Sequence, residues 1–265
     1  TRVRSSAASD VYKRQVLECV VNISEGTDPA LIGRLRTAAL PALLDLHTDP
    51  HHNRAVFTMA GAPDLLDAAV RSLARLAVEL LDLTTHQGAH PRIGVLDVVP
   101  WIDLAHPAAT ATNASLAARD GFATWAGAEL ELPCFLYGPH RTLPEIRRSA
   151  WSVLHPDRGP SHPHPTAGAS AVGARGVLVA YNLWLRSDRL ADARTVAASI
   201  RSPHVRALGL AVGGQAQVSC NLIRPTTVGP AEAHAAVSAL APIDRAELVG
   251  LLPLSILRQI PAARW

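Results

Sequence analysis

Residues 63–82 read PDLLDAAVRSLARLAVELLD, and their apolar side chains recur every three or four positions. That spacing places the apolar residues along one side of an α-helix. Pro63 suits the first helical turn, and Asp64 and Asp67 suit the positive end of the helix dipole. The apolar positions are Leu66, Ala69, Val70, Leu73, Leu76, Ala77 and Leu80. The stretch therefore predicts a long amphipathic helix.

Short apolar runs typical of strands lie on both sides of this helix. Before it come strand-like runs at 17–23, 42–48 and 54–60 and a helical pattern at 29–40, and after it comes a run at 93–102. The order is strand, helix, strand, strand, helix, strand, which is the split arrangement of ferredoxin-like folds. A further helix at about 107–127 and a strand at 132–137 extend this half.

The second half repeats the order of elements without a detectable sequence repeat. Its predicted elements are a strand at 176–185, a helix at 190–200, strands at 206–212 and 215–223, a helix at 231–240 and an apolar run at 248–252. We therefore predict an α+β protein of two ferredoxin-like βαββαβ subdomains, residues 16–176 and 177–265, with helices on one face of each sheet. A loop at about 155–174, rich in Pro, Gly, Ser and His, joins the halves, and loops of this length are often functional.

Composition excludes several classes of protein. Hydrophobic residues make up 48% and charged residues 18% of the 265-residue chain, which excludes general disorder. No apolar run approaches the ~18 residues that a membrane helix needs. The first fifteen residues hold four basic residues against one acidic residue, so they account for the whole net charge of +3. They also hold Lys13, the only lysine. We interpret residues 1–15 as a non-native or disordered extension and predict a cytoplasmic protein that binds neither nucleic acid nor membrane.

Histidines cluster near the second turn, after the long helix and in the central loop, and such clusters suit proton transfer near neutral pH. His86 and His90 have the four-residue spacing of a two-histidine metal site on a helix. However, Gly88 and Pro91 disfavour a helix there, and Gln87 stands where a zinc hydrolase needs a glutamate. We predict no metal site.

Several blocks of sequence occur in one order over residues 16–258. They are residues 18–26 (ECVVNISEG), Asn53-Arg54, residues 86–94 (HQGAHPRIG), 133–138 (PCFLYG), Asp157, Gly159-Pro160, 168–175 (GASAVGAR), 216–219 (AQVS) and 247–251 (ELVGL). With these blocks the chain resembles the formiminotransferase domain family. The resemblance implies two related α/β subdomains with an active-site groove between them, usually in a homodimer.

The same resemblance implies a reaction and a set of site residues. The family transfers a formimino group from N-formimino-L-glutamate to N5 of tetrahydrofolate, a co-substrate of one-carbon metabolism, during histidine degradation. It implies that His90 is the general acid and base and that the loop after Asp157 binds folate. The predicted folate-binding residues are Gly159, Pro160, Ser161, His162, Pro163, His164, Pro165, Thr166, Ala167 and Gly168. Guanidinium groups bind carboxylates in a bidentate manner, so we also predict substrate binding by Arg54, Arg92 and Arg175, together with His86.

Three alternatives stay open at the level of sequence. The same fold could use 5-formyltetrahydrofolate as a formyl donor, because the two donors differ by one atom at the reacting carbon. A non-catalytic folate-binding paralogue is a second alternative, although His90 and its glycine-rich surroundings argue against it. A metal hydrolase is the third, and full activity after exhaustive chelation would exclude it.

Overall fold

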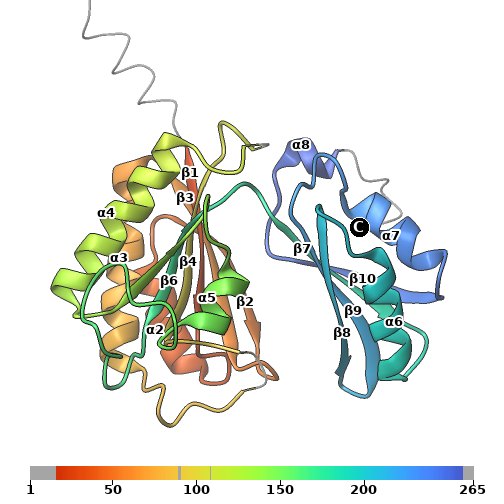
Figure 1. Ribbon diagram of the computed structural model, residues 1–265, viewed down its shortest axis with the longest axis horizontal. Helices are drawn as coiled ribbons and strands as arrows, with labels where there is room; N and C mark the ends of the chain where they lie inside the picture. The colour runs from red at the N-terminus through yellow and green to blue at the C-terminus, as the bar shows by residue number, and fades with distance from the viewer. Residues whose placement is uncertain (1–15, 89–90, 108, 259–265) are drawn as a thin grey trace, which may run out of the picture. The chain divides into compact units, whose positions relative to one another are not determined.

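The computed structural model describes residues 16–88, 91–107 and 109–258. The predicted extension at 1–15 therefore lies outside the described residues. The chain divides into two compact units, one ending at Arg175 and the other beginning at Gly176, and each is built on its own sheet (Figure 1). We call them unit 1 and unit 2. An α+β protein of two subdomains, as predicted from the sequence, is confirmed.

Unit 1 contains a ferredoxin-like core followed by an extension. The core elements are β1 (Leu17–Ile23), α2 (Pro29–Ala38), β2 (Leu43–Asp49), β3 (Arg54–Gly61), α3 (Pro63–Leu80) and β4 (Leu96–Asp103). The extension consists of α4 (Asn113–Glu129), β5 (Cys134–Tyr137), α5 (Leu143–Ser149) and β6 (Ser170–Ala174). The sheet order is β2-β3-β1-β4-β6-β5, in which the first four strands are antiparallel neighbours and the last three run parallel.

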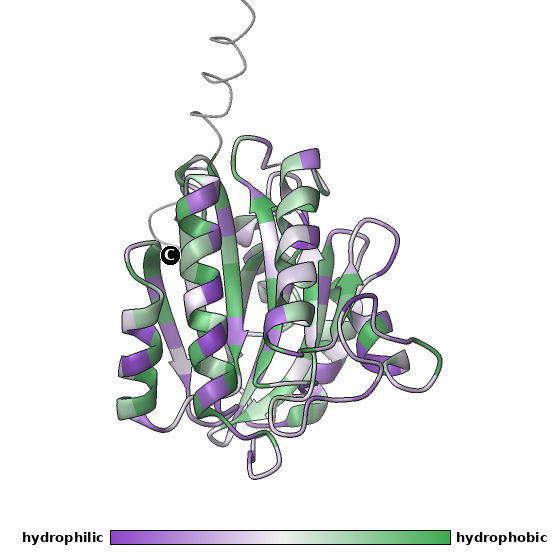
Figure 2. Cartoon of the chain, turned by 90° about the vertical axis from the view of Figure 1, so that its left-hand side faces the viewer, coloured by the Kyte–Doolittle hydropathy of each residue, from purple (hydrophilic) through white to green (hydrophobic). Residues whose placement is uncertain are grey.

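Local sequence explains where the helices begin. The Asp28 carboxylate accepts hydrogen bonds from the amides of Ala30 and Leu31 and caps α2. Thr112 and Ser115 cap α4 reciprocally, so this helix begins at Asn113 and not at 107 as predicted. In Figure 2 the helices that face the viewer carry both hydrophilic and hydrophobic residues, as amphipathic helices do. Among the described residues no helix has the length and apolar character needed to cross a membrane.

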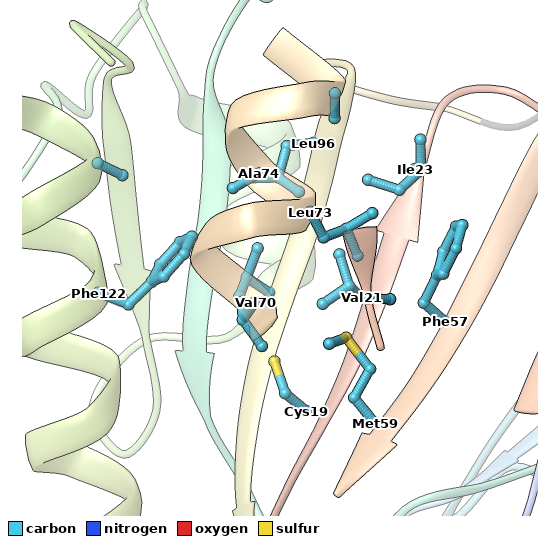
Figure 3. Close-up of a cluster of buried hydrophobic side chains, with 14 of the residues drawn as sticks. Cys19, Val21, Ile23, Phe57, Met59, Val70, Leu73, Ala74, Leu96 and Phe122 are labelled. Carbon is cyan, nitrogen blue, oxygen red and sulfur yellow. The ribbon is translucent and has the colours of Figure 1, made fainter. Parts of the chain in front are cut away.

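The core of unit 1 lies between the sheet and the helices α2, α3 and α4. The predicted apolar side of α3 is buried there, with Val70, Leu73 and Ala74 fully enclosed. Figure 3 shows these side chains facing Cys19 and Val21 of β1, with further contributions from β3, β4 and α4. Burial of such side chains is worth about 1.5–3 kcal/mol each, so this layer is the main source of stability of the unit.

Helix α5 lies on the other face of the sheet. Its Ile146 is buried against Val98, Phe135 and Tyr137, which point away from the α3 side. Neither this seven-residue helix nor β6 was predicted, because both are short and β6 (SAVGA) consists of small residues inside the expected loop. On this face α5 packs against residues of β4, β5 and β6.

Up to residue 258, unit 2 consists of a ferredoxin-like core followed by one short helix. Its elements are β7 (Val179–Leu185), α6 (Leu190–Ile200), β8 (Val205–Val212), β9 (Gln215–Leu222), α7 (Pro230–Ser238), β10 (Ile243–Val249) and a short α8 (Leu254–Leu257). The strand order β10-β7-β9-β8 matches the order of the four core strands in unit 1. The last strand begins at Ile243, five residues before the predicted apolar run.

Strand direction in unit 1 brings several loops to one edge of the sheet. Strands β4, β5 and β6 begin at this edge, β1 and β2 end there, and β3 begins there. The loops at this edge are residues 24–28, 50–53, 155–169 and the described parts of 81–95 (81–88 and 91–95), and we call them together the loop edge. The segment of 81–88 runs along the lower side of unit 1 in Figure 1.

Candidate functional site

The loop edge collects most of the residues predicted to bind substrates. Arg54 opens β3, His86 and Arg92 lie in the 81–95 loop, and residues 159–168 lie in the 155–169 loop. His90, the predicted acid and base, lies outside the described residues. The chain segments on either side of it, residues 86–88 and 91–94, belong to the loop edge, and their contacts show how this part of the site is built.

Asn53 joins three of these loops. Its backbone is left-handed (φ +47°), a conformation that asparagine tolerates better than most residues. Its side-chain Oδ1 accepts a hydrogen bond from the Gly26 amide (2.8 Å), and its Nδ2 donates one to the Gln87 carbonyl (2.8 Å). The β2–β3 turn therefore fixes both the loop after β1 and the segment before His90.

Both ring nitrogens of His86 have protein partners. Nδ1 contacts the Arg92 guanidinium, which can only donate, so the proton lies on Nε2, which donates to the Asn53 carbonyl (3.0 Å). Burial and the neighbouring Arg92 lower the pKa of His86 below its ordinary value. Arg92 also donates to the Gly88 carbonyl (2.6 Å). The geometry suits a neutral His86 that orders the loop.

The second half of the predicted folate loop forms a closed turn against residues 91–95, which together with residues 86–88 we call the His90 segment. The His164 and Gly168 backbones are hydrogen-bonded to each other in both directions (2.8 and 3.0 Å). The His164 ring accepts hydrogen bonds from the amides of Thr166 and Ala167 through Nδ1. Ala167 accepts a hydrogen bond from the Val95 amide (3.0 Å), and Ala169 donates one to the Ile93 carbonyl (2.9 Å). Two regions recognised separately in the sequence are thus joined directly.

The first half of the same loop has a different environment. Gly159 approaches Gly127 of α4 so closely that a Cβ on Gly127 would lie 2.6 Å from the Gly159 nitrogen. Ser161, His162, Pro163 and Pro165 are exposed, and Pro160 is half-buried. Side chains available to a ligand are therefore concentrated in the middle of the loop.

Charged groups surround Arg54 at the start of β3. Burial lowers the pKa of Arg54, whereas Asp49 and Asp97 oppose this effect. Its Nε is buried without a hydrogen-bond partner among the described residues. Asp49 accepts hydrogen bonds from the His52 amide (3.0 Å) and ring (2.6 Å). Although burial raises the pKa of Asp49, these bonds leave it below the ordinary value. Arg54 therefore places a largely buried guanidinium, with an enclosed Nε, at the loop edge.

Arg175 lies at the opposite ends of the strands. Its amide donates to the Trp101 carbonyl (3.1 Å), near the end of β4. Burial raises the pKa of Tyr137 to about 12, and the hydrogen-bonded Arg175 opposes this effect. Burial likewise raises the pKa of Glu18, again against Arg175. Within unit 1, Arg175 is separated from Arg54 and Arg92 by the length of the sheet.

Sequence reasoning gave no role to two charged residues of the site, Asp97 and Arg147. Asp97 is 2% exposed, and burial raises its pKa although Arg147 and the Ile93 amide stabilise the carboxylate. The only sign of this role in the sequence was one acidic residue, Asp97, inside the apolar run 95–102.

Among the described residues no group of three or more His, Cys, Asp or Glu could hold a metal ion.

Comparison with known proteins identifies the family. Residues 16–175 match the family described as "Formiminotransferase domain, N-terminal subdomain". The chain belongs to the formiminotransferase domain family. The resemblance inferred from the colinear blocks is confirmed, and the loop edge lies entirely within the matched residues of this formiminotransferase domain.

Relatives of this formiminotransferase domain come from bacteria, archaea and animals. The chain is 34% identical to the glutamate formimidoyltransferase of Streptococcus pyogenes serotype M1, over 79% of this chain and 78% of that protein. It is 30% identical to the glutamate formimidoyltransferase of Thermoplasma acidophilum, over 90% of this chain and 88% of that protein. It is 32% identical to the formimidoyltransferase-cyclodeaminase of Rattus norvegicus, over 92% of this chain and 51% of that protein. The chain thus spans about half of that last relative.

Proposed function

We propose that this chain transfers the formimino group of N-formimino-L-glutamate to N5 of tetrahydrofolate, giving 5-formiminotetrahydrofolate and glutamate. The names of the relatives support this reaction. The observation that carries it is the loop edge, because the segments around His90, the Arg54 guanidinium and the predicted folate loop meet there in one family domain. The substrates are therefore a glutamate derivative and a reduced folate.

The chemistry requires one proton to move between two nitrogens. N5 attacks the formimino carbon, a new N5–C bond forms, and a tetrahedral intermediate results. When the C–N bond to glutamate breaks, the departing nitrogen must gain the proton that N5 loses. In our proposal the imidazole of His90 accepts the proton from N5 and delivers it to the departing nitrogen, which contributes about 10²–10⁴-fold to the rate. Contact between the bound substrates supplies further acceleration.

Arg54 is proposed to bind a carboxylate of the glutamyl donor. Its partly buried guanidinium keeps one nitrogen without a partner among the described residues. If the side chain turns to expose this nitrogen when the donor binds, a carboxylate supplies a charge-assisted hydrogen bond, worth about 1.5–3 kcal/mol. Arg92 contacts His86 and Gly88, so we assign it first to loop order and only second to substrate. Arg175 and His86 remain lower-ranking candidates for binding the carboxylates of the donor and of the folate glutamate tail.

The loop of residues 159–168 is proposed to receive tetrahydrofolate. Pro160, Pro163 and Pro165 restrict its backbone, and the closed turn from His164 to Gly168 fixes one end against the His90 segment. A loop ordered in this way binds a flat ring with a small entropic cost.

The proposal also includes a homodimer located in the cytoplasm. Size-exclusion chromatography with light scattering would test the dimer, and cell fractionation would test the location.

A product assay with both donors tests the function. The purified chain should convert tetrahydrofolate to its 5-formimino derivative with N-formimino-L-glutamate, before and after treatment with a chelator. Transfer from 5-formyltetrahydrofolate alone would replace this proposal with the formyl reaction. Binding of reduced folate without transfer from either donor would indicate a non-catalytic binding protein, and loss of activity on chelation would indicate a metal enzyme.

His90→Ala should lower turnover at least ~10²-fold while folate affinity stays within a few-fold. The matched control is His140→Ala, because His140 is an exposed histidine of the same unit. Steady-state kinetics and calorimetric titration with a reduced folate measure the two quantities. Near-normal turnover in His90→Ala would remove His90 from the mechanism.

Arg54→Met should raise the KM for N-formimino-L-glutamate by about 10-fold to 100-fold, which corresponds to loss of one charge-assisted hydrogen bond. Affinity for tetrahydrofolate should change much less. Arg36→Met, on the exposed side of α2, is the control for loss of a positive charge. An unchanged KM for the donor would assign its carboxylates to other residues.

A further inference from the structure

A buried ion pair contacts residues 91–93, which directly follow His90 in the chain. The Asp97 side chain is 3% exposed and that of Arg147 is 20% exposed, and Asp97 Oδ2 accepts a hydrogen bond from Arg147 Nη2 at 2.6 Å. The two residues come from β4 and α5, fifty positions apart in the chain. The reaction described above uses neither of them.

Each partner of this pair also holds one backbone group of the His90 segment. Asp97 Oδ1 accepts a hydrogen bond from the Ile93 amide at 2.8 Å. Arg147 donates through its other terminal nitrogen, Nη1, to the Pro91 carbonyl. Pro91 and Ile93 are the first and third residues after His90. One ion pair therefore fixes the backbone at two points immediately beyond the proposed catalytic residue.

The elements that carry the pair are themselves well anchored. Arg147 follows Ile146, which is fully buried in the cluster between α5 and the sheet. Helix α5 begins with a reciprocal cap between Thr142 and Glu145. Asp97 is the second residue of β4, between β1 and β6. The pair thus connects the His90 segment to the sheet and to the helix on its second face.

Stability alone is a poor explanation for such a pair. Removing two charges from water costs about as much as their attraction returns, and well-packed apolar residues often stabilise a protein equally well. Apolar side chains cannot, however, hold a particular carbonyl and a particular amide in fixed directions. The arrangement therefore points to control of backbone geometry.

We propose that Asp97 and Arg147 are positioning residues, which hold the backbone at Pro91 and Ile93 so that His90 is presented correctly to the reacting nitrogens. This inference rests on the proposed function, since it assigns His90 the proton transfer. It predicts a loss in the chemical step and not in folate binding. The KM for the donor is a weaker readout, because Asp97 and Arg147 interact electrostatically with Arg54.

Arg147→Met is the variant that tests the pair, because it keeps the aliphatic stem and removes both hydrogen bonds. We expect kcat to fall at least ~10-fold, since a displacement of about 1 Å can cost 10²-fold, while the KM for tetrahydrofolate stays within about 3-fold. Arg147→Lys keeps the positive charge, but its single ammonium group must serve both the Pro91 carbonyl and Asp97 Oδ2. Compared with Arg147→Met, this variant should therefore regain stability but only part of kcat. The control is Arg148→Met, the exposed neighbour on the same helix.

Hydrogen exchange of the Ile93 amide gives a second readout that does not depend on activity. In folded Arg147→Met this amide should exchange at least ~10-fold faster than in the wild type, with Arg148→Met unchanged. A fall in the unfolding midpoint with unchanged kcat and unchanged exchange would show a purely structural pair and overturn the proposal. If the wild type transfers neither a formimino nor a formyl group, the proposed function has failed. Unchanged exchange would then overturn the positioning role as well, and faster exchange would retain it for whatever reaction this segment performs.

Discussion

Gly168 provides a quantitative test of how the predicted folate loop is held. Its backbone is left-handed (φ +72°), and a Cβ added there would lie 2.4 Å from the Ile93 carbonyl oxygen and 2.7 Å from Leu83 Cδ2. The left-handed conformation costs an L-residue about 1–2 kcal/mol. Forcing one extra carbon against backbone costs about 1–3 kcal/mol more. We therefore expect Gly168→Ala to lower the free energy of unfolding by about 2–5 kcal/mol.

Two other glycines separate the contributions to this cost. Gly214 has φ +80° with nothing within 4 Å of the added Cβ, so Gly214→Ala should cost only the backbone strain of about 1–2 kcal/mol. Gly33 lies in α2 with open space around it, so Gly33→Ala should stabilise the protein by about 0.5–1 kcal/mol. Urea denaturation followed by circular dichroism measures all three variants.

The result that would refute this reasoning is a Gly168→Ala cost no larger than that of Gly214→Ala. In that case the loop would yield to the new side chain, and the close contact with Ile93 would not define its position. If the expected order holds, larger substitutions at 168, including valine, report on the fold and cannot measure folate contact. His162→Ala is then the better probe of folate affinity, because His162 is exposed in the middle of the same loop.

Two further predictions concern the dependence of stability on pH. The pKa of His86 in the native state is lowered from 6.5, so as the pH falls below 6.5 the unfolded chain binds a proton at this ring more readily than the native state does. Stability should therefore fall as the pH drops below 6.5, and the fall should be smaller in His86→Gln; equal slopes would contradict the assignment of a neutral ring. Burial raises the pKa of Tyr137 from 10.0 to about 12, so the native state keeps its phenol proton while the unfolded chain loses it. Stability should decline as the pH rises above 10, and Tyr137→Phe should remove part of this decline, as measured by urea midpoints at each pH.

Elements with strong periodicity could be predicted closely from the sequence. The helix expected at 63–82 spans 63–80, and the one expected at 190–200 has those bounds. The short α5 and β6 were missed because their stability depends on contacts with distant residues. β6, for instance, pairs with β4 and β5, and its small residues have no pattern of their own.

The candidate site was predicted in its parts but not in its arrangement. Sequence blocks marked the His90 segment and the 159–168 loop, and the structure joins them through Val95 and Ala167. Arg175 belongs to a block as well, yet it follows the end of β6 and therefore lies across the sheet from Arg54. That separation depends on the parallel direction of β4 and β6, which no local pattern encodes. Asp97 was overlooked because a single charge in an apolar strand predicts neither its partner nor its burial.

The extension of the first sheet has a consequence for the order of folding. Pairing of β4 with β6 joins Val98 to Ala171, and such long-range contacts form slowly because a large loop must close first. All the elements of the four-strand core precede α4 in the chain, whereas the contacts of residues 167–169 with the His90 segment come only with β6. A nascent chain released before β6 emerges would therefore lack the residues that hold the His90 segment, and it would be catalytically inactive.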